Sequence, residues 1–250
     1  MDPVITNKLL EINAKFYHDF GDAFAATRRR IQPGIRRILA EEIPHDGNWL
    51  DLGCGSGALG LEWSMSGRTG AYLGLDFSQP LLEEAQKVTA EFSNQTLSIR
   101  YAFADLLDPD WSDSLEAQSF DGVLAFASLH HIPGRENQRR ILSDVYHLLK
   151  PGGVLILSVW QFQNSAKLMS RVLSWDTVGL NDTAVEPGDT LLDWRYALPD
   201  QTERQGIRYV HLFTPESLER LGNDAGFRLT KQFFSDGTEG NLALYQVFRT

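Results

Sequence analysis

The stretch Trp49-Leu-Asp-Leu-Gly-Cys-Gly-Ser-Gly57 ends an apolar run in a cluster of glycines, and Gly74-Leu-Asp76 ends the next apolar run in an acid. Glycine lets the backbone turn sharply and come close to a ligand. A dinucleotide-binding turn has the spacing Gly-x-Gly-x-x-Gly without an acid inside it, whereas here the order is Asp51-x-Gly53-x-Gly55-x-Gly57. The acid after the second run would lie beside the turn, where it can accept hydrogen bonds from a ribose. These stretches predict an α/β nucleoside-binding fold and disfavour an NAD-dependent oxidoreductase.

Strands and helices are predicted to alternate beyond the glycine turn. Apolar runs predict strands at 48–52, 71–76, 97–104, 120–126 and 154–160, and helical spacing predicts helices from Gly57 to Met65, at 81–92 and at 136–149. The run at 120–126 is continuously apolar, which is typical of a strand buried on both faces. Such alternation implies a parallel sheet with right-handed crossovers.

The two flanks of this core have a different pattern. Helices are predicted at 7–20 and 35–42, before the first strand. After the fifth strand the alternation stops over residues 161–206, and a segment of that length in a compact domain is more often functional cover than idle loop. A strand at 207–213, a helix that starts at Thr214 and a strand pair at 227–234 and 242–248 complete the chain.

Composition limits the class of protein. The 250 residues are 42% hydrophobic and 22% charged, and they carry a formal net charge of -10. The single cysteine, Cys54, excludes an internal disulfide framework and a cysteine-rich zinc site, so no metal is expected. The start of the sequence has no basic-then-apolar leader, and no run reaches the ~18 apolar residues of a membrane span. We therefore expect a cytoplasmic protein that does not bind membranes.

The glycine turn resembles motif I of the class I S-adenosylmethionine (SAM) methyltransferases, and Asp76 and Lys150-Pro-Gly-Gly153 fit the same family. The resemblance implies a Rossmann-like fold, with a mostly parallel seven-stranded sheet, helices on both faces, and a lid formed by the N-terminal helices and the insertion after strand five. It implies one domain over residues 1–250. Its parts would be a helical cap (1–46), a SAM-binding core (47–160), a substrate-side insertion (161–213) and a C-terminal helix with a strand pair (214–250).

The same resemblance implies SAM as the cofactor and S-adenosylhomocysteine as the product. It assigns Asp76 to the ribose, Asp105 with Ala104 to the adenine, and Gly53 and Ala125 to the methionyl part. The cofactor-binding residues expected in this way are Asp51, Gly53, Gly55, Gly57, Asp76, Phe77, Ala104, Asp105, Ala125 and Phe126.

The flanks resemble the tRNA wobble-uridine carboxymethyl methyltransferases. The resemblance rests on Phe16-Tyr-His-Asp-Phe20 with Phe24-Ala-Ala-Thr-Arg28, on Ser128-Leu-His-His131, on Val159-Trp160, and on Gly188–Arg195 before Arg208-Tyr-Val-His-Leu-Phe213. It spans most of the chain. Around Asp193-Trp-Arg195 the family commonly has a Pro-Trp-basic sequence, so the correspondence departs there.

That family methylates a carboxylate on the modified uridine. A carboxylate is ionised at pH 7 because such groups have pKa values near 4, so the reaction needs alignment and exclusion of water rather than a general base. Arginine and histidine are suited to hold the acceptor. The candidate residues are Arg28, His131, Asp193, Arg195, Arg208 and His211, although Asp193 and Arg195 would equally make a loop ion pair and His211 would equally pack within a strand.

Three hypotheses about the acceptor and the partners stay open. The first is tRNA, with a small zinc-binding activator subunit of the kind that eukaryotic members of the family use. The second is a small-molecule acid, and the third is a non-catalytic SAM-binding subunit, which the intact acids and glycines disfavour. The acidic net charge opposes broad attraction to nucleic acid, but two arginine clusters bear on the choice. If Arg28–Arg37 and Arg135–Arg140 join into one positive surface beside the pocket, tRNA is favoured; if they are scattered, the small molecule is favoured.

Overall fold

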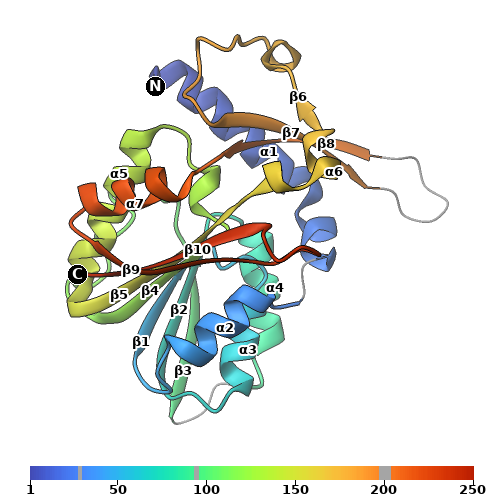
Figure 1. The fold of residues 1–250 in the computed structure, drawn as a ribbon. Coiled ribbons are helices and arrows are strands. Elements are labelled where there is room, and N and C mark those ends of the chain that lie inside the picture. The colour runs from blue at the N-terminus through green and yellow to red at the C-terminus, as the bar shows by residue number, and fades with distance from the viewer. Residues whose placement is uncertain (28–29, 93–95, 197–203) are drawn as a thin grey trace.

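Strand β1 (Asn48–Leu52), which leads into the glycine turn, lies inside a large sheet (Figure 1). The computed structural model describes residues 1–27, 30–92, 96–196 and 204–250. In this part of the chain the large sheet has seven strands in the order β3-β2-β1-β4-β5-β10-β9. The strands of this sheet are β2 (Gly70–Asp76), β3 (Leu97–Phe103), β4 (Phe120–Phe126), β5 (Leu149–Trp160), β9 (Arg228–Ser235) and β10 (Ala243–Arg249), together with β1.

Strands β1 to β5 pair in parallel, and β10 pairs antiparallel with β5 and β9. The predicted Rossmann-like α/β fold with a mostly parallel seven-stranded sheet is therefore confirmed. Strand β5 starts five residues earlier than predicted, because Leu149 already pairs with Phe120. The register then shifts, and Val154 pairs with Gly122.

Helices cover both faces of the large sheet. Helices α2 (Pro33–Glu41) and α3 (Ala58–Met65) pack Ile38 and Trp63 against Trp49 on one face. Helices α5 (Arg135–Leu148) and α7 (Pro215–Asp224) pack against the other face, through Leu142 and Leu218 among others. Helix α4 (Gln79–Thr89) follows β2 and contacts α3 and β3. None of the described helices is long and apolar enough to cross a membrane.

A second sheet lies beyond the large one, and only its last strand was predicted from the sequence. It has the order β6-β7-β8, with β6 (Val172–Leu173), β7 (Asp189–Tyr196) and β8 (Arg204–His211) all antiparallel. Helix α1 (Pro3–Thr27), which is longer than the predicted 7–20, packs against β8, and Figure 1 shows the two at the same end of the molecule. The short helices η1 (Leu129–His131), η2 (Phe162–Asn164), α6 (Ala166–Met169) and η3 (Trp175–Val178) complete the described elements.

Candidate active site

The carboxyl ends of the central strands open into one cavity of about 600 Å³. Asp51, Asp76 and Phe126 reach it from β1, β2 and β4, and Trp160 reaches it from the end of β5. The strand order reverses between β1 and β4, which is where ligands bind in open α/β sheets. Helix α1 and strand β8 supply the opposite wall, through Tyr17 among others, so the cavity lies between the two sheets.

The glycine turn has the backbone geometry that the sequence predicts. Gly53, Gly55 and Gly57 have φ values of 76°, 54° and 78°, which side chains disfavour. A Cβ on Gly53 would lie 2.7 Å from Cβ of Ser128, so this position has no room for one. The backbone N–H groups of Gly53 and Cys54 both donate to the Leu75 carbonyl, which ties the turn to β2.

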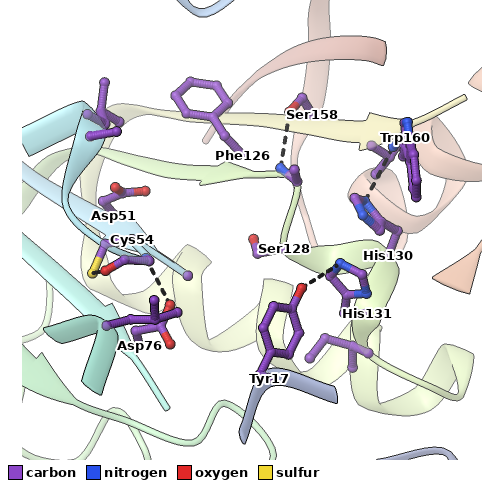
Figure 2. Close-up of a pocket in the computed structure, with 18 of the residues that line it drawn as sticks. Tyr17, Asp51, Cys54, Asp76, Phe126, Ser128, His130, His131, Ser158 and Trp160 are labelled. Carbon is purple, nitrogen blue, oxygen red and sulfur yellow. Dashed lines mark hydrogen bonds between the residues drawn. The ribbon is translucent and has the colours of Figure 1, made fainter. Parts of the chain in front are cut away.

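Two buried acids lie beside the turn (Figure 2). Asp76 accepts from the backbone N–H of Gly55 and of Ser78, both at 2.9 Å, and burial raises its pKa. Asp51 accepts from the Tyr72 hydroxyl at 2.5 Å. Burial, with a smaller contribution from Asp76, raises the pKa of Asp51 to about 7. This end of the cavity is therefore prepared for a ligand that carries positive charge and hydroxyl groups.

The loop after β3 closes the same end. Asp105 is exposed and its carboxylate accepts from the Leu107 N–H, while Leu106 and Leu107 line the cavity. Arg140 of α5 holds this loop from behind, because its guanidinium donates to the carbonyls of Leu106 and Leu107 at 2.9 and 3.1 Å.

The double histidine after β4 lies at the far end of the cavity. His131 has its Nδ1 3.1 Å from the Tyr209 carbonyl and its Nε2 3.1 Å from the Tyr17 hydroxyl (Figure 2). Because a carbonyl only accepts, Nδ1 carries the proton and Nε2 accepts from Tyr17. His130 is buried and accepts at Nδ1 from the Trp160 backbone N–H. The two rings therefore act in opposite tautomers, and His131 holds Tyr17 in the cavity wall.

Arg208 brings a buried positive charge to the same end. Its side chain is 4% exposed, and its guanidinium lies 5.0 Å from the Phe16 ring and 5.1 Å from the Trp160 ring. Aromatic faces attract a guanidinium and keep water away from it. Arg30 also lines the cavity, but its side chain is exposed. An arginine held in this way is suited to bind a carboxylate oxygen through a charge-assisted hydrogen bond.

The structure brings together most of the residues predicted from the sequence. Ten of them line the cavity, namely Asp51, Gly53, Gly55, Asp76, Phe77, Ala104, Asp105, Phe126, His131 and Arg208. Gly57 instead is the N-cap residue that precedes α3, and Ala125 packs in the core.

The remaining acceptor candidates are not among the lining residues. Asp193 forms an ion pair with Arg195, whose side chain is 52% exposed, and the Asp189 carboxylate accepts from Nδ1 of His211 at 2.7 Å. Arg28 lies outside the described residues.

Several lining residues were not predicted as site residues. They are Asn13, Tyr17, Ser128, Ser158, Trp160, Asp236 and Tyr245. Of these, Tyr17, Ser128 and Trp160 stand in stretches that carry the family resemblance. Asn13 and Tyr17 are four residues apart and therefore share one face of a helix, which is a signal that the sequence contains. The others reach the cavity only because of how the strands are ordered.

A family model described as a methyltransferase domain matches residues 24–232. The chain belongs to this methyltransferase family. It is a SAM-dependent enzyme, and its cavity fits the cofactor, since acids and open glycine backbone face the space that a sulfonium, an amino group and a ribose need. SAM and S-adenosylhomocysteine are therefore its methyl donor and its product.

Three relatives of this chain carry methyltransferase names, and two of those names specify an acceptor. A protein of Encephalitozoon cuniculi, provisionally named a methyltransferase, is 29% identical over 86% of both chains. The tRNA (carboxymethyluridine(34)-5-O)-methyltransferase of Arabidopsis thaliana is 28% identical over 60% of this chain and 34% of its own length. The trans-aconitate 2-methyltransferase of Deinococcus radiodurans is 29% identical over 59% of this chain and 48% of its own. This chain thus spans about a third to a half of the length of the two relatives with a named acceptor.

Solved structures share the fold. The 1,6-didemethyltoxoflavin-N1-methyltransferase of Burkholderia thailandensis, crystallised with S-adenosylhomocysteine, has a TM-score of 0.65 at 17% identity and covers 100% of this chain and 91% of its own. A methyltransferase structure from a complex with the Haloferax volcanii Trm112 activator has a TM-score of 0.61 at 16% identity, covering 95% of this chain and 96% of its own.

Proposed function

We propose that this methyltransferase esterifies a carboxylate oxygen, and that its acceptor is the 5-carboxymethyluridine of a tRNA wobble position. The observation that carries the carboxylate is Arg208, a buried guanidinium in the same cavity as the glycine turn. The Arabidopsis relative supports the acceptor, since its name specifies carboxymethyluridine.

The residues of the cofactor end would hold SAM. Asp76 would accept from the ribose hydroxyls, the loop at Asp105 would bind the adenine, and Asp51 would face the amino group. SAM supplies a methyl group on a positively charged sulfur, and the transfer breaks the S–CH₃ bond as the O–CH₃ bond forms. The ionised acceptor needs no general base, which agrees with a site whose His131 has both ring nitrogens engaged.

Arg208 would orient the acceptor. One carboxylate oxygen would bind the guanidinium while the other stays free to attack, because an arginine on both oxygens would also stabilise the ground state. The surrounding rings of Phe16 and Trp160 exclude water, and the opposite charges of donor and acceptor cancel during the transfer.

The partner is part of the proposal. The described arginines of α2 and α5 do not form one positive surface, since the two helices cover opposite faces of the large sheet. A zinc-binding activator subunit would supply further tRNA-binding surface. The Haloferax neighbour, which comes from a complex with the Trm112 methyltransferase activator, supports the need for an activator.

The charge distribution favours a second candidate acceptor, a small carboxylic acid. The scattered arginines give no broad attraction to nucleic acid, and the Deinococcus relative is named for a small acid. The chemistry at Arg208 would be the same for both acceptors.

Mass spectrometry of nucleosides separates the two. We expect tRNA incubated with enzyme, SAM and a Trm112-type activator to convert 5-carboxymethyluridine into its methyl ester. Absence of conversion with and without the activator, together with S-adenosylhomocysteine release on a panel of small carboxylic acids, would establish the second candidate. Absence of both reactions would reject carboxylate methylation.

Replacing Arg208 tests the carboxylate directly. We expect Arg208→Gln to lower kcat/KM for the acceptor roughly 30- to 5000-fold, since truncating one partner of a buried charge pair costs about 2–5 kcal/mol. Calorimetric affinity for S-adenosylhomocysteine should stay within about twofold. Arg220→Gln, at an exposed position of α7, is the matched control. Equal kcat/KM in the two variants would refute the role of Arg208.

A further inference from the structure

A single amide side chain fastens α1 to the edge of the small sheet. Asn13 is 5% exposed, its Oδ1 accepts from the Tyr209 N–H at 2.8 Å, and its Nδ2 donates to the Tyr209 carbonyl at 3.1 Å. Strand β8 is an edge strand, so these two backbone groups have no neighbouring strand on that side. The Asn13 amide pairs with them as a strand would, and it meets the requirement that buried backbone groups be hydrogen-bonded.

The same contact includes the histidine after β4. Nδ2 of Asn13 lies 3.2 Å from the His131 carbonyl, and the Tyr209 carbonyl also accepts from Nδ1 of His131. His131 in turn accepts from the hydroxyl of Tyr17, one helical turn after Asn13. Asn13, His131 and Tyr209 thus join α1, η1 and β8 at one point, which we call the three-element junction.

The junction lies next to the residues that would hold the acceptor. Arg208 directly precedes Tyr209 in β8, and its guanidinium lies over Phe16 of α1. The helix and the strand approach so closely that a Cβ on Gly206 would lie 2.8 Å from a ring carbon of Phe16. A shift of α1 along β8 would therefore move Arg208 and Tyr17 relative to the glycine turn.

We propose that Asn13 is a positioning residue for methyl transfer, which sets where Arg208 and Tyr17 stand relative to the cofactor. The inference rests on the proposed function, in which Arg208 binds the carboxylate of the acceptor. Rates of transfer depend steeply on alignment, and a displacement of about 1 Å can cost about 100-fold. Asn13 acts through the junction, while the cofactor end of the cavity is held independently by β2 and α5.

The test compares Asn13→Ala with Asn7→Ala, an exposed asparagine on the same helix. We expect Asn13→Ala to lower acceptor kcat/KM roughly 10- to 100-fold, with S-adenosylhomocysteine affinity within about twofold of wild type. Asn7→Ala should match wild type in both. Unchanged S-adenosylhomocysteine binding also shows that the variant is folded.

Asn13→Asp adds a readout that a purely structural contact would not give. The ionised carboxylate only accepts and faces the carbonyls of Tyr209 and His131, whereas the protonated form regains a donor. The activity of Asn13→Asp relative to wild type should therefore rise as the pH is lowered from 8 to 6. Hydrogen exchange of the Tyr209 amide should be faster in Asn13→Ala than in wild type, whatever the acceptor.

The outcomes separate the two claims. If wild-type enzyme transfers no methyl group to any carboxylate, the proposed function fails, and the role of Asn13 in positioning Arg208 for the acceptor fails with it. If wild type is active and Asn13→Ala matches Asn7→Ala in kcat/KM, only the positioning role is refuted. If the Tyr209 amide exchanged at the same rate in Asn13→Ala and in wild type, the claim that Asn13 holds α1 to β8 would likewise be refuted.

Discussion

At the scale of single residues, the site depends on two buried acids with different hydrogen-bond partners. Asp51 is buried in β1 between β2 and β4, at the edge of the cavity, and its carboxyl takes up a proton more readily than an exposed one. Asp76 is also buried, but two backbone N–H groups favour its charged form. Before any ligand binds, burial therefore favours the neutral form of Asp51, whereas the hydrogen bonds to Asp76 favour its charged form.

The raised pKa of Asp51 predicts how stability changes with pH. Between about pH 4 and its folded pKa of about 7, the folded protein keeps a proton that the unfolded chain has lost. The contribution of Asp51 to the free energy of unfolding therefore falls as the pH rises through this window, by on the order of a few kcal/mol, and is constant above it. In urea unfolding, Asp51→Asn should therefore gain stability relative to wild type as the pH rises from about 4 to 7. Asp182 is exposed, and Asp182→Asn serves as the control. If the free energies of unfolding of Asp51→Asn and Asp182→Asn depended on pH in the same way, the raised pKa of Asp51 would be contradicted.

Asp76 predicts a loss of cofactor affinity. Asp76→Ala removes the acceptor for the Gly55 and Ser78 N–H groups as well as the proposed ribose contact. Hydrogen bonds to charged groups contribute about 1.5–3 kcal/mol each, so S-adenosylhomocysteine should bind roughly 10- to 100-fold more weakly by calorimetry. Glu83→Ala, on the exposed side of α4, serves as the control. Equal affinity of the two variants would remove Asp76 from the cofactor site.

At the scale of elements, helix α5 supports the cofactor end without lining it. Arg140 donates to three carbonyls of the loop after β3, those of Leu106, Leu107 and Asp108. Asp144 holds Arg140 in turn and also accepts from Nε1 of Trp111. The neighbouring Arg139 points elsewhere on the same helix and pairs with Glu136.

This contrast predicts that two adjacent arginines have different effects. Arg140→Met should weaken S-adenosylhomocysteine binding about 3- to 30-fold, since three carbonyls of the loop lose their hydrogen bonds to a charged donor. Arg139→Met should leave the affinity unchanged, because an exposed ion pair contributes little. Calorimetry on the two variants decides, and equal affinities would show that the loop holds its position without α5.

At the scale of the whole molecule, charge is distributed in local pairs. Arg36 and Arg37 of α2 pair with Glu62 and Glu41, while Arg135 and Arg139 of α5 pair with Asp224 and Glu136. The two helices lie on opposite faces of the large sheet (Figure 1). The described arginine clusters therefore do not add up to one positive surface.

This arrangement predicts weak binding of tRNA by the chain alone. Affinity for nucleic acid rises with the number of phosphates that basic residues neutralise. We expect a dissociation constant weaker than about 1 μM at 0.15 M salt, with a shallow dependence on salt, and tighter binding once a Trm112-type activator is added. Fluorescence anisotropy with labelled tRNA measures both. Tight and steeply salt-dependent binding by the chain alone would mean that residues outside the described part dominate recognition.

The cofactor half could be predicted from the sequence because its determinants are local. Glycines with positive φ at 53, 55 and 57, and acids at the ends of β1 and β2, follow from short-range pattern and from the rule that parallel strands end at one edge of a sheet. The strand alternation determined the parallel sheet for the same reason. The differences in this half are the start of β5, where the ladder changes register, the bounds of α4, and Gly57 and Ala125, which are not among the lining residues.

The acceptor half depended on the tertiary structure. Asn13 and Tyr209 are 196 positions apart along the chain, and no local pattern indicates that an amide in a helix will pair with an edge strand. The sequence identified Arg208 and His131 as candidates, but it did not separate them from Asp193, Arg195 and His211, which lie away from the cavity lining. The packing of α1 on β8 determines which polar side chains face the cavity. That packing arises from long-range burial of apolar surface, which the sequence does not encode as a local pattern.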